Sequence, residues 1–291
     1  MADIAPGELQ EPFLHETVQR LARTPWVVHT PLGQLDRVGE QAAPAGVIFH
    51  VARCGSTLVS QMLKQHPDTV VYSEPLAINE LLVPPHAGDR ASRVAALRSL
   101  GARFSAHAGR RYVLKLSSWN TLFADLIVEA FPQTPLALCV RDPLEVAVSL
   151  QQSRPRWLHD DHAALFSNAV QGNLQAKGPD ERIALFIAAF LRAAGMLPAN
   201  RSLLLPYLSL PDAVVAQLAP HFGLPLDDPV RQRISSVSRH HSKSRPGHLS
   251  DFVPDAERKR AAASAGLSQL VETFCRPAYQ TLFMRLASVS Y

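Results

Sequence analysis

The feature that most constrains this chain is a strand-like apolar run that passes through a short polar turn into a helical pattern, within residues 46–65. Residues 46–51 are mostly apolar and rich in β-forming side chains, which is typical of a buried parallel strand. Residues 53–57 are polar and include a glycine, and residues 58–65 have the apolar spacing of a helix. This order predicts the first strand and helix of an α/β sheet.

Four further segments have the same short apolar character as the first strand. They lie at residues 69–72, 112–116, 136–140 and 202–205. Helical patterns follow the first three of them, and the chain beyond Pro206 is mainly helical. Because repeated strand–helix units build parallel sheets, we expect a three-layer α/β fold with a central parallel sheet flanked by helices.

The chain is expected to have two parts. Residues 1–45 form an N-terminal appendage with a polar helix around residues 14–21 and a possible hairpin at residues 26–38. Residues 46–291 form one α/β domain with a helical C-terminal part. Within it, the polar and basic residues 235–250 have no apolar periodicity and are predicted to form a loop.

Composition narrows the class of protein. With 47% hydrophobic and 19% charged residues, the chain is typical of a soluble globular protein. A net charge of +4, spread along the sequence, suits an anionic small ligand as readily as a nucleic acid. The widely spaced Cys54, Cys139 and Cys275 suggest neither a disulfide framework nor a zinc site, and the histidines have no metal-ligand spacing. We find no signal peptide or membrane span and expect a cytoplasmic protein without a metal.

The turn after the first strand is a candidate anion site. Backbone N–H groups and the positive end of a helix dipole meet there, and this arrangement attracts phosphate. Gly55 permits close approach of the backbone, Ser56 and Thr57 supply hydroxyl groups, and Arg53 supplies a charged fork. The turn lacks the Gly-Lys-Ser/Thr ending of ATPases. An ordinary strand-to-helix turn with a Ser/Thr N-cap is the alternative.

A second candidate anion site follows the strand at residues 136–140. Arg141 comes at the carboxyl end of this strand, and Asp142 and Pro143 are suited to begin the next helix. Ligands of open α/β sheets bind along that edge, so Arg141 and the first turn are expected to face one cleft. Ser149 lies about two helical turns further on. Two anion sites indicate a doubly phosphorylated ligand, whereas a salt bridge from Arg141 to a neighbouring carboxylate is the alternative.

Together these residues resemble the paired signatures of the sulfotransferases that use 3′-phosphoadenosine-5′-phosphosulfate (PAPS). The first signature is Arg53-Cys54-Gly55-Ser56-Thr57-Leu58, and the second is Arg141-Asp142-Pro143 with Ser149. The match looks closest to the tyrosylprotein sulfotransferase branch, because His66-Pro67, Glu74 and Lys115 recur at that branch's spacing. It covers roughly residues 46–155, with a weaker echo in Ser242-Lys243.

This resemblance implies a P-loop NTPase-like fold and a specific set of roles. Arg53, Cys54, Gly55, Ser56, Thr57 and Leu58 would bind the 5′-phosphosulfate, Arg141 and Ser149 the 3′-phosphate, and Lys243 would belong to a basic loop closing over the nucleotide. Glu74 would be the general base, Lys115 would neutralise the bridging oxygen, and Arg53 would hold the transferring sulfonate. The product would be 3′,5′-adenosine bisphosphate, and no metal is expected.

Departures from the family leave the acceptor open. Cytosolic sulfotransferases place a histidine just after the lysine of the third strand, whereas this chain has Lys115-Leu116-Ser117-Ser118, which favours Glu74 as base. The acceptor is a small molecule, a glycan or a peptide, with no nucleic acid or membrane partner expected, and the oligomeric state cannot be read. A kinase-like phosphotransferase and a degenerate nucleotide-binding module are the alternative functions.

Simpler interpretations of individual residues also stand. Glu74 precedes Pro75 and would then only cap a helix starting near Leu76. Lys115 would be a surface lysine at a strand end. Cys54 is interpreted as a tolerated small residue of the turn and not as a nucleophile, because no histidine lies beside it in sequence.

Overall fold

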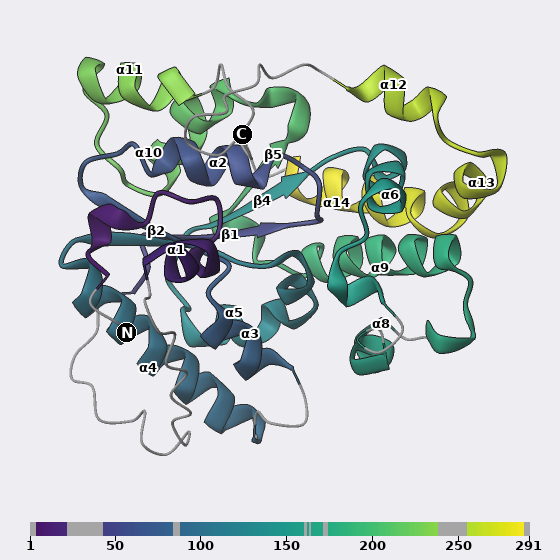
Figure 1. Cartoon of the computed structure of the whole chain (residues 1–291), viewed down its shortest axis with the longest axis horizontal. Coiled ribbons are helices and arrows are strands. Elements are labelled where there is room, and N and C mark those ends of the chain that lie inside the picture. Colours follow the sequence, from purple (N-terminus) through teal and green to yellow (C-terminus); the bar gives the residue numbers. More distant parts are fainter. Residues whose placement is uncertain are drawn as a thin grey trace.

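A five-stranded parallel sheet forms the centre of the protein, with strand order β2-β3-β1-β4-β5 (Figure 1). The computed structural model describes residues 4–21, 43–83, 88–159, 162, 164–170, 174–237 and 255–287. The strands are β1 (Gly46–His50), β2 (Thr69–Ser73), β3 (Arg111–Lys115), β4 (Leu136–Val140) and β5 (Ser202–Pro206). The expected α/β class and all five strands are confirmed, with boundaries that differ by at most one residue.

Helices cover both faces of the sheet (Figure 1). One face carries α2 (Ser56–Leu63), the π-helical turn η9 (Val214–Leu218), α10 (Ala219–His221) and α11 (Asp228–Ser236). The opposite face carries α3 (Leu76–Leu82), α4 (Arg90–Ala108) and α5 (Ala124–Ala130). The molecule therefore has the three layers expected for a doubly covered parallel sheet.

A second group of helices stands beside the β4–β5 side of the sheet and packs around α9 (Pro179–Ala194). Its other members are α6 (Pro143–Gln152), α12 (Ala256–Ala261), α13 (Ala265–Phe274) and α14 (Arg276–Ala287). Short elements complete the chain: η1 (Pro6–Glu8), α1 (Leu14–Leu21), η3 (Ser118–Phe123), η4 (Arg156–Leu158), η5 (Ala164–Phe166), α8 (Ser167–Val170), η6 (Leu174–Ala176), η7 (Ala199–Arg201) and η8 (Tyr207–Ser209).

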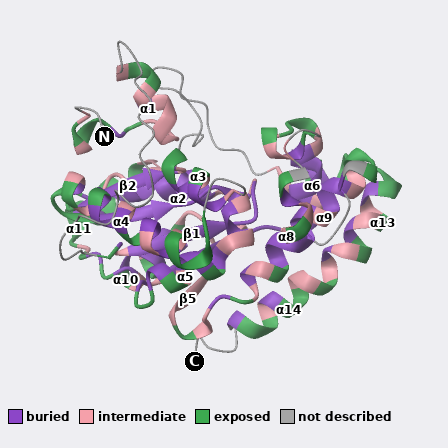
Figure 2. Cartoon of the chain, turned by 90° about the horizontal axis from the view of Figure 1, so that it is seen from below, coloured by how far each residue is buried: buried purple, intermediate pink, exposed green. Residues whose placement is uncertain are grey.

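The core follows from the apolar strands. Every residue of β1, β2 and β4 is buried, and Figure 2 shows this burial concentrated in the sheet and on the inner faces of the helices. Within α9, Phe186 and Phe190 are fully buried and pack edge to face against Trp157. No helix among the described residues combines the length and apolar character needed to cross a membrane.

The N-terminal segment lies along the edge of the sheet. The predicted helix is present as α1. His107 at the end of α4 hydrogen-bonds the carbonyl of Ile4 at 2.7 Å, and the Lys64 ammonium donates to the carbonyl of Glu11. Covering an edge strand protects its unpaired backbone groups. The expected hairpin at residues 26–38 lies outside the described residues, and the domain boundary near residue 45 stays a prediction.

His66, part of the His-Pro pair noted in the sequence, connects two segments of the fold. Its Nδ1 accepts the backbone N–H of Asp68 at 3.2 Å, so Nε2 carries the proton and donates to the carbonyl of Pro225 at 2.8 Å. The imidazole is buried at the end of α2, far along that helix from its first turn. These contacts give His66 a role in packing.

Candidate functional site

The turn between β1 and α2 has an unusual backbone. Ala52, Arg53 and Gly55 have φ angles of 66°, 48° and 84°, all in the left-handed region. Left-handed non-glycine residues cost on the order of 1–2 kcal/mol each and persist where the surroundings hold them. Successive backbone N–H groups of a turn can point toward one position and make an anion-binding concavity.

Gly55 is required by both its backbone angle and its surroundings. A Cβ atom added here would lie 2.8 Å from Leu210 Cδ1 and 3.1 Å from Tyr207 Cδ2. Gly55 is also the N-cap of α2, so neither Ser56 nor Thr57 caps the helix with its side chain. The N-cap alternative raised by the sequence is therefore absent, and both hydroxyl side chains are buried in the first turn of α2.

The other residues of the turn differ in what they offer a ligand. Arg53 Nη2 donates to the carbonyl of Ser153 at 2.8 Å and to its hydroxyl at 2.7 Å, just after α6. Cys54 is fully buried, and burial raises the pKa of its thiol to about 11, so it is no nucleophile. Leu58 packs in the hydrophobic core, so only its backbone amide is available to a ligand.

Glu74 and Lys115 meet at the carboxyl ends of β2 and β3. The Lys115 ammonium donates to Glu74 Oε1, and the Glu74 backbone N–H donates to the Lys115 carbonyl at 2.7 Å. Lys115 has only 1% of its side chain exposed, whereas Glu74 has 24% exposed. Glu74 has a left-handed φ of 54°, and the next helix is capped by Pro75. The interpretations of Glu74 as a helix cap and of Lys115 as a surface residue are therefore wrong.

Two residues that the sequence did not single out complete this centre. Ser117 Oγ donates to Glu74 Oε2 at 3.3 Å. His50 Nδ1 accepts the backbone N–H of Ala52, so its Nε2 carries the proton and donates to the carbonyl of Leu116 at 2.9 Å. The same Nε2 lies 3.8 Å from Glu74 Oε1. A histidine that ends a buried strand was the available sequence signal.

The electrostatics of this centre favour an ionised carboxylate. Burial alone would raise the pKa of Glu74, but Lys115, His50 and the hydrogen bond from Ser117 outweigh burial and hold that pKa below its ordinary value. Phe13 covers the other side of the ammonium, with its ring centroid 5.2 Å from Lys115 Nζ. Glu74 is thus the exposed member of a buried ion pair.

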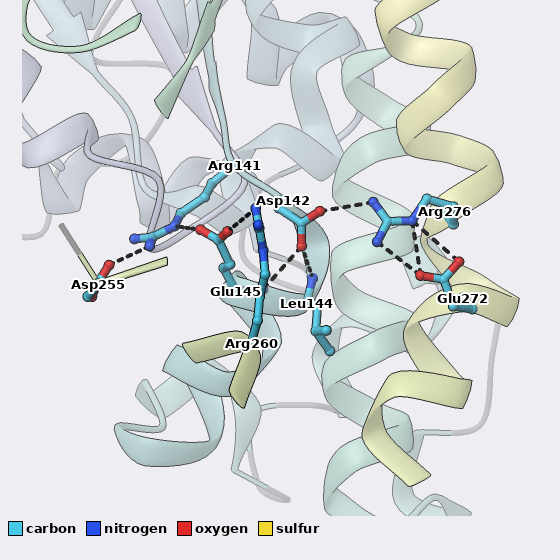
Figure 3. A network of polar contacts seen from close by, with 8 residues as sticks. All are labelled: Arg141, Asp142, Leu144, Glu145, Asp255, Arg260, Glu272 and Arg276. Carbon is cyan, nitrogen blue, oxygen red and sulfur yellow. Dashed lines mark hydrogen bonds and ion pairs between the residues drawn. The ribbon is translucent and has the colours of Figure 1, made fainter. Parts of the chain in front are cut away.

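The second predicted anion site is occupied by protein carboxylates (Figure 3). Arg141 Nε donates to Glu145 Oε2 at 2.7 Å, and Arg141 Nη2 donates to Asp255 Oδ1. Arg141 is buried, with 5% exposed, and its guanidinium lies 3.9 Å from the ring centroid of Tyr207. The salt bridge considered from the sequence is therefore present.

Further charges surround these carboxylates. Lys259 pairs with Asp255 and Arg260 with Glu145, each at 2.7 Å. Burial would raise the pKa of Asp255, but Arg141 and Lys259 hold it below the ordinary value. Arg141, Lys259 and Arg260 thus outnumber the two carboxylates, and the cluster keeps an excess of positive charge. Asp142 caps α6 as predicted and also pairs with Arg276, which in turn pairs with Glu272 (Figure 3).

Ser149 lies two turns along α6, and its hydroxyl is buried without a hydrogen-bond partner in the part of the chain that the structure describes. A buried hydroxyl without a partner is costly and indicates a missing ligand or water. Lys243 lies outside the described residues, as does most of the expected loop at residues 235–250, whose first residues belong to α11.

Tyr207 joins the two candidate anion sites. It follows β5, and its ring lies against both Gly55 in the first turn and the Arg141 guanidinium. The two sites also share adjacent strands, because His50 of β1 is paired with Cys139 of β4. The expectation that Arg141 and the first turn face one region of the sheet edge is met. Among the described residues, no group of three or more His, Cys, Asp or Glu side chains is arranged to hold a metal ion.

Comparisons with known proteins bear on the fold. No protein-family model and no curated protein sequence matches the chain. Among solved structures, the sulfotransferase domain from the curacin biosynthetic pathway is 15% identical, with a TM-score of 0.50 over 85% of this chain and 99% of its own. The sulfotransferase domain of the Synechococcus PCC 7002 olefin synthase is 17% identical, covering 81% of this chain and 96% of its own, with a TM-score of 0.49.

A mouse sulfotransferase in complex with PAP also matches. It is 13% identical, with a TM-score of 0.46 over 87% of this chain and 92% of its own. At these sequence identities the similarity concerns the fold alone, and the conclusion on the fold rests on the curacin-pathway domain. The chain has a sulfotransferase-type fold, with the central parallel sheet and flanking helices that the sequence predicted.

Proposed function

We propose that the protein is a sulfotransferase that moves a sulfonate group from PAPS to a hydroxyl or amine acceptor. The observation that carries this proposal is the contact of a partly exposed carboxylate, Glu74, with a buried ammonium, Lys115, at the same sheet edge as the left-handed turn before α2. A base, a cation and an anion-binding turn are the parts that in-line transfer of a charged group needs.

The donor site fits a nucleotide with two separate phosphate groups. The turn at residues 52–55 would hold the 5′-phosphosulfate, since Gly55 leaves no room for a side chain and Arg53 borders the turn. Arg141 and the partnerless Ser149 hydroxyl would hold the 3′-phosphate, together with the excess positive charge of Lys259 and Arg260. When bound, PAPS supplies the activated sulfonate, and 3′,5′-adenosine bisphosphate is its leaving group.

Glu74 would act as general base toward the acceptor. Its Oε2 is held by the Ser117 hydroxyl, and Lys115 keeps the carboxylate ionised and ready to accept a proton. A carboxylate with a lowered pKa is a weak base. Movement of the Lys115 ammonium from Glu74 toward the leaving oxygen would therefore have two effects. It would neutralise the charge of the leaving group, and it would raise the pKa of Glu74 and so restore its basicity.

His50 and Phe13 would keep this centre in shape. His50 connects the first turn, through Ala52, to the backbone just after Lys115, through Leu116. Phe13 shields the Lys115 ammonium from water, which strengthens its interaction with a neighbouring anion. Both residues act on the orientation and surroundings of Glu74 and Lys115.

Calorimetric binding tests the donor half of the proposal. We expect the native protein to bind 3′,5′-adenosine bisphosphate in preference to 5′-AMP and ATP, with or without magnesium. Arg141→Ala should remove that preference, because the second phosphate loses its charged fork. Preference for ATP with magnesium would instead support a kinase-like phosphotransferase. Tight bisphosphate binding without transfer to any acceptor of a broad panel would support a binding module.

A further inference from the structure

A cavity of about 420 Å³ lies beside α6 and α9, outside the groups described above. Its walls come from the segment after α6, from the end of η4 and from the start of α9. The lining residues are Arg154, Leu158, His159, Lys177, Pro179, Arg182 and Ile183. This volume falls within the range of small-molecule sites, roughly 300–1,000 Å³.

The described lining is basic. Four of its seven residues carry basic side chains, and none of the seven is a carboxylate. Of the two acidic residues at the start of α9, Glu181 pairs with the lining residue Lys177 at 2.7 Å, and Asp180 accepts from Gln151 at 2.8 Å. The cavity therefore presents the Arg154 guanidinium and the Lys177 ammonium, which is shared with Glu181, to a ligand.

Hydrogen bonds from Arg182 hold the cavity wall in place. Arg182 is 7% exposed and donates to the carbonyls of Leu158 at 3.2 Å and Lys177 at 3.1 Å. These bonds fasten the end of η4 and the segment before α9 to α9 itself. Next to Leu158, the Trp157 ring packs 5.0 Å from the ring of Phe186. A preformed wall reduces the ordering cost of binding a ligand.

The cavity adjoins the proposed transfer site through Arg53. Arg154, a lining residue, directly follows Ser153, whose carbonyl and hydroxyl both accept from Arg53. Arg53 belongs to the left-handed turn that would hold the transferring group. A molecule reaching from the transfer site past Ser153 would therefore meet the basic lining.

We propose that this cavity binds an anionic group of the acceptor. The acceptor is then a hydroxyl or amine compound that also carries a carboxylate, phosphate or sulfate, which Arg154 and Lys177 recognise by charge-assisted hydrogen bonds. That the bound molecule is the acceptor of a transfer reaction rests on the proposed function, whereas the anion site itself does not depend on that function.

A series of three phenols of similar size tests the site without any donor. Calorimetry would compare 4-hydroxyphenylacetate, 4-ethylphenol and tyramine, which are anionic, neutral and cationic. Asp160 and Asp161, next to His159 in the sequence, lie outside the described residues. The difference in affinity among the three phenols therefore reports the sign of the charge that the whole cavity presents. We expect the anionic phenol to bind most tightly.

Variants then locate the binding. The double change Arg154→Ala and Lys177→Ala should weaken 4-hydroxyphenylacetate by about 10-fold or more, since each cation contributes a charge-assisted hydrogen bond. Arg156→Ala is the matched control, because Arg156 is an exposed arginine of η4 outside the lining. It should leave this binding unchanged.

Three results would overturn the anion site. These are no binding of 4-hydroxyphenylacetate, equal binding of the three phenols, or equal weakening by Arg156→Ala and the double variant. Charge-selective binding that survives in a protein with no sulfonate transfer would uphold the site and reject the proposed function, so the two failures are distinguishable. With transfer present, the double variant should raise KM for the anionic phenol.

Discussion

Two buried ionic centres lie at the same edge of the sheet, and they differ in how their charges are paired. At the ends of β2 and β3, one ammonium, Lys115, meets one carboxylate, Glu74, which keeps 24% of its side chain exposed. At the end of β4, Arg141 is held between Glu145 and Asp255, and Glu145 also pairs with Arg260 (Figure 3). Asp255 pairs in addition with Lys259. The first centre is open to a reactant, and the second is filled by protein groups.

This difference indicates that the two centres have different functions. Glu74 and Lys115 come from adjacent strand ends in register, where Ser73 pairs with Lys115, so their contact is set by the sheet itself. Asp255 reaches Arg141 from a segment far along the chain, with 21% of its side chain exposed. A phosphate arriving at Arg141 meets the Asp255 carboxylate already bound there, whereas Glu74 keeps 24% of its side chain exposed to an incoming acceptor.

The largest effect is expected at the open centre. Glu74→Gln should lower kcat by about 10²- to 10⁴-fold, the usual contribution of a general base, because the amide cannot accept the acceptor's proton. The affinity for 3′,5′-adenosine bisphosphate should stay within error of the native value. Steady-state kinetics and calorimetry on the same preparation provide the check, and near-normal turnover would remove Glu74 from this role.

Ser149→Ala separates a ligand-binding hydroxyl from a structural one. The Ser149 hydroxyl has no hydrogen-bond partner among the described residues, so its removal should leave Tm unchanged or slightly raised. If the hydroxyl donates to the 3′-phosphate, bisphosphate affinity should fall by about 10-fold, as for a lost hydrogen bond to a charged group. Calorimetry and thermal melts measure both quantities. A destabilised protein with unchanged affinity for the bisphosphate would show that the Ser149 hydroxyl stabilises the fold and does not bind the phosphate.

Asp255→Asn sharpens the contrast in the opposite direction. Without its charge, Asp255 competes less well for Arg141, and bisphosphate binding should tighten by about 10-fold, equivalent to about 1.4 kcal/mol. Glu257→Gln in the following helix removes an exposed negative charge from the same region and should change affinity much less. Weaker binding by Asp255→Asn would mean that Asp255 helps to build the phosphate site.

The smallest effect is expected from pH. Activity requires ionised Glu74, so it is lost only as pH falls through the pKa of this carboxylate, which lies below the ordinary value of about 4.3. The plot of kcat/KM against pH should therefore be flat from about pH 7.5 to 5.5. An acid limb within this pH range would contradict the assignment of the titrating group to Glu74.

The sequence predicted more about the strands than about the contacts at their ends. Residues 136–140 form β4 with the expected bounds, because a buried parallel strand is a continuous apolar run that side-chain pattern alone reveals. Asp142 and Pro143 begin α6 as predicted, because helix caps are local in sequence. The resemblance to the sulfotransferases also implied a common site for Glu74 and Lys115, and the structure has them at the ends of adjacent parallel strands.

Contacts between distant segments were not predictable in this way. Ser117 and His50 beside Glu74, Tyr207 between Gly55 and Arg141, and Asp255 on Arg141 each depend on how separate loops pack, which no local pattern encodes. The basic cavity belongs to the same class, because its walls come from segments separated in sequence and held together by Arg182.

The sequence by itself determined the parallel α/β architecture, the turn before α2 and the chemical types of the site residues, because these follow from short-range periodicity, glycine and helix-capping rules. Only the tertiary structure decided that Glu74 is held ionised by Lys115 while Arg141 is already paired with carboxylates. The reason is physical: the charge state and availability of a side chain depend on its burial and on neighbours brought together by packing, and these are properties of the folded chain.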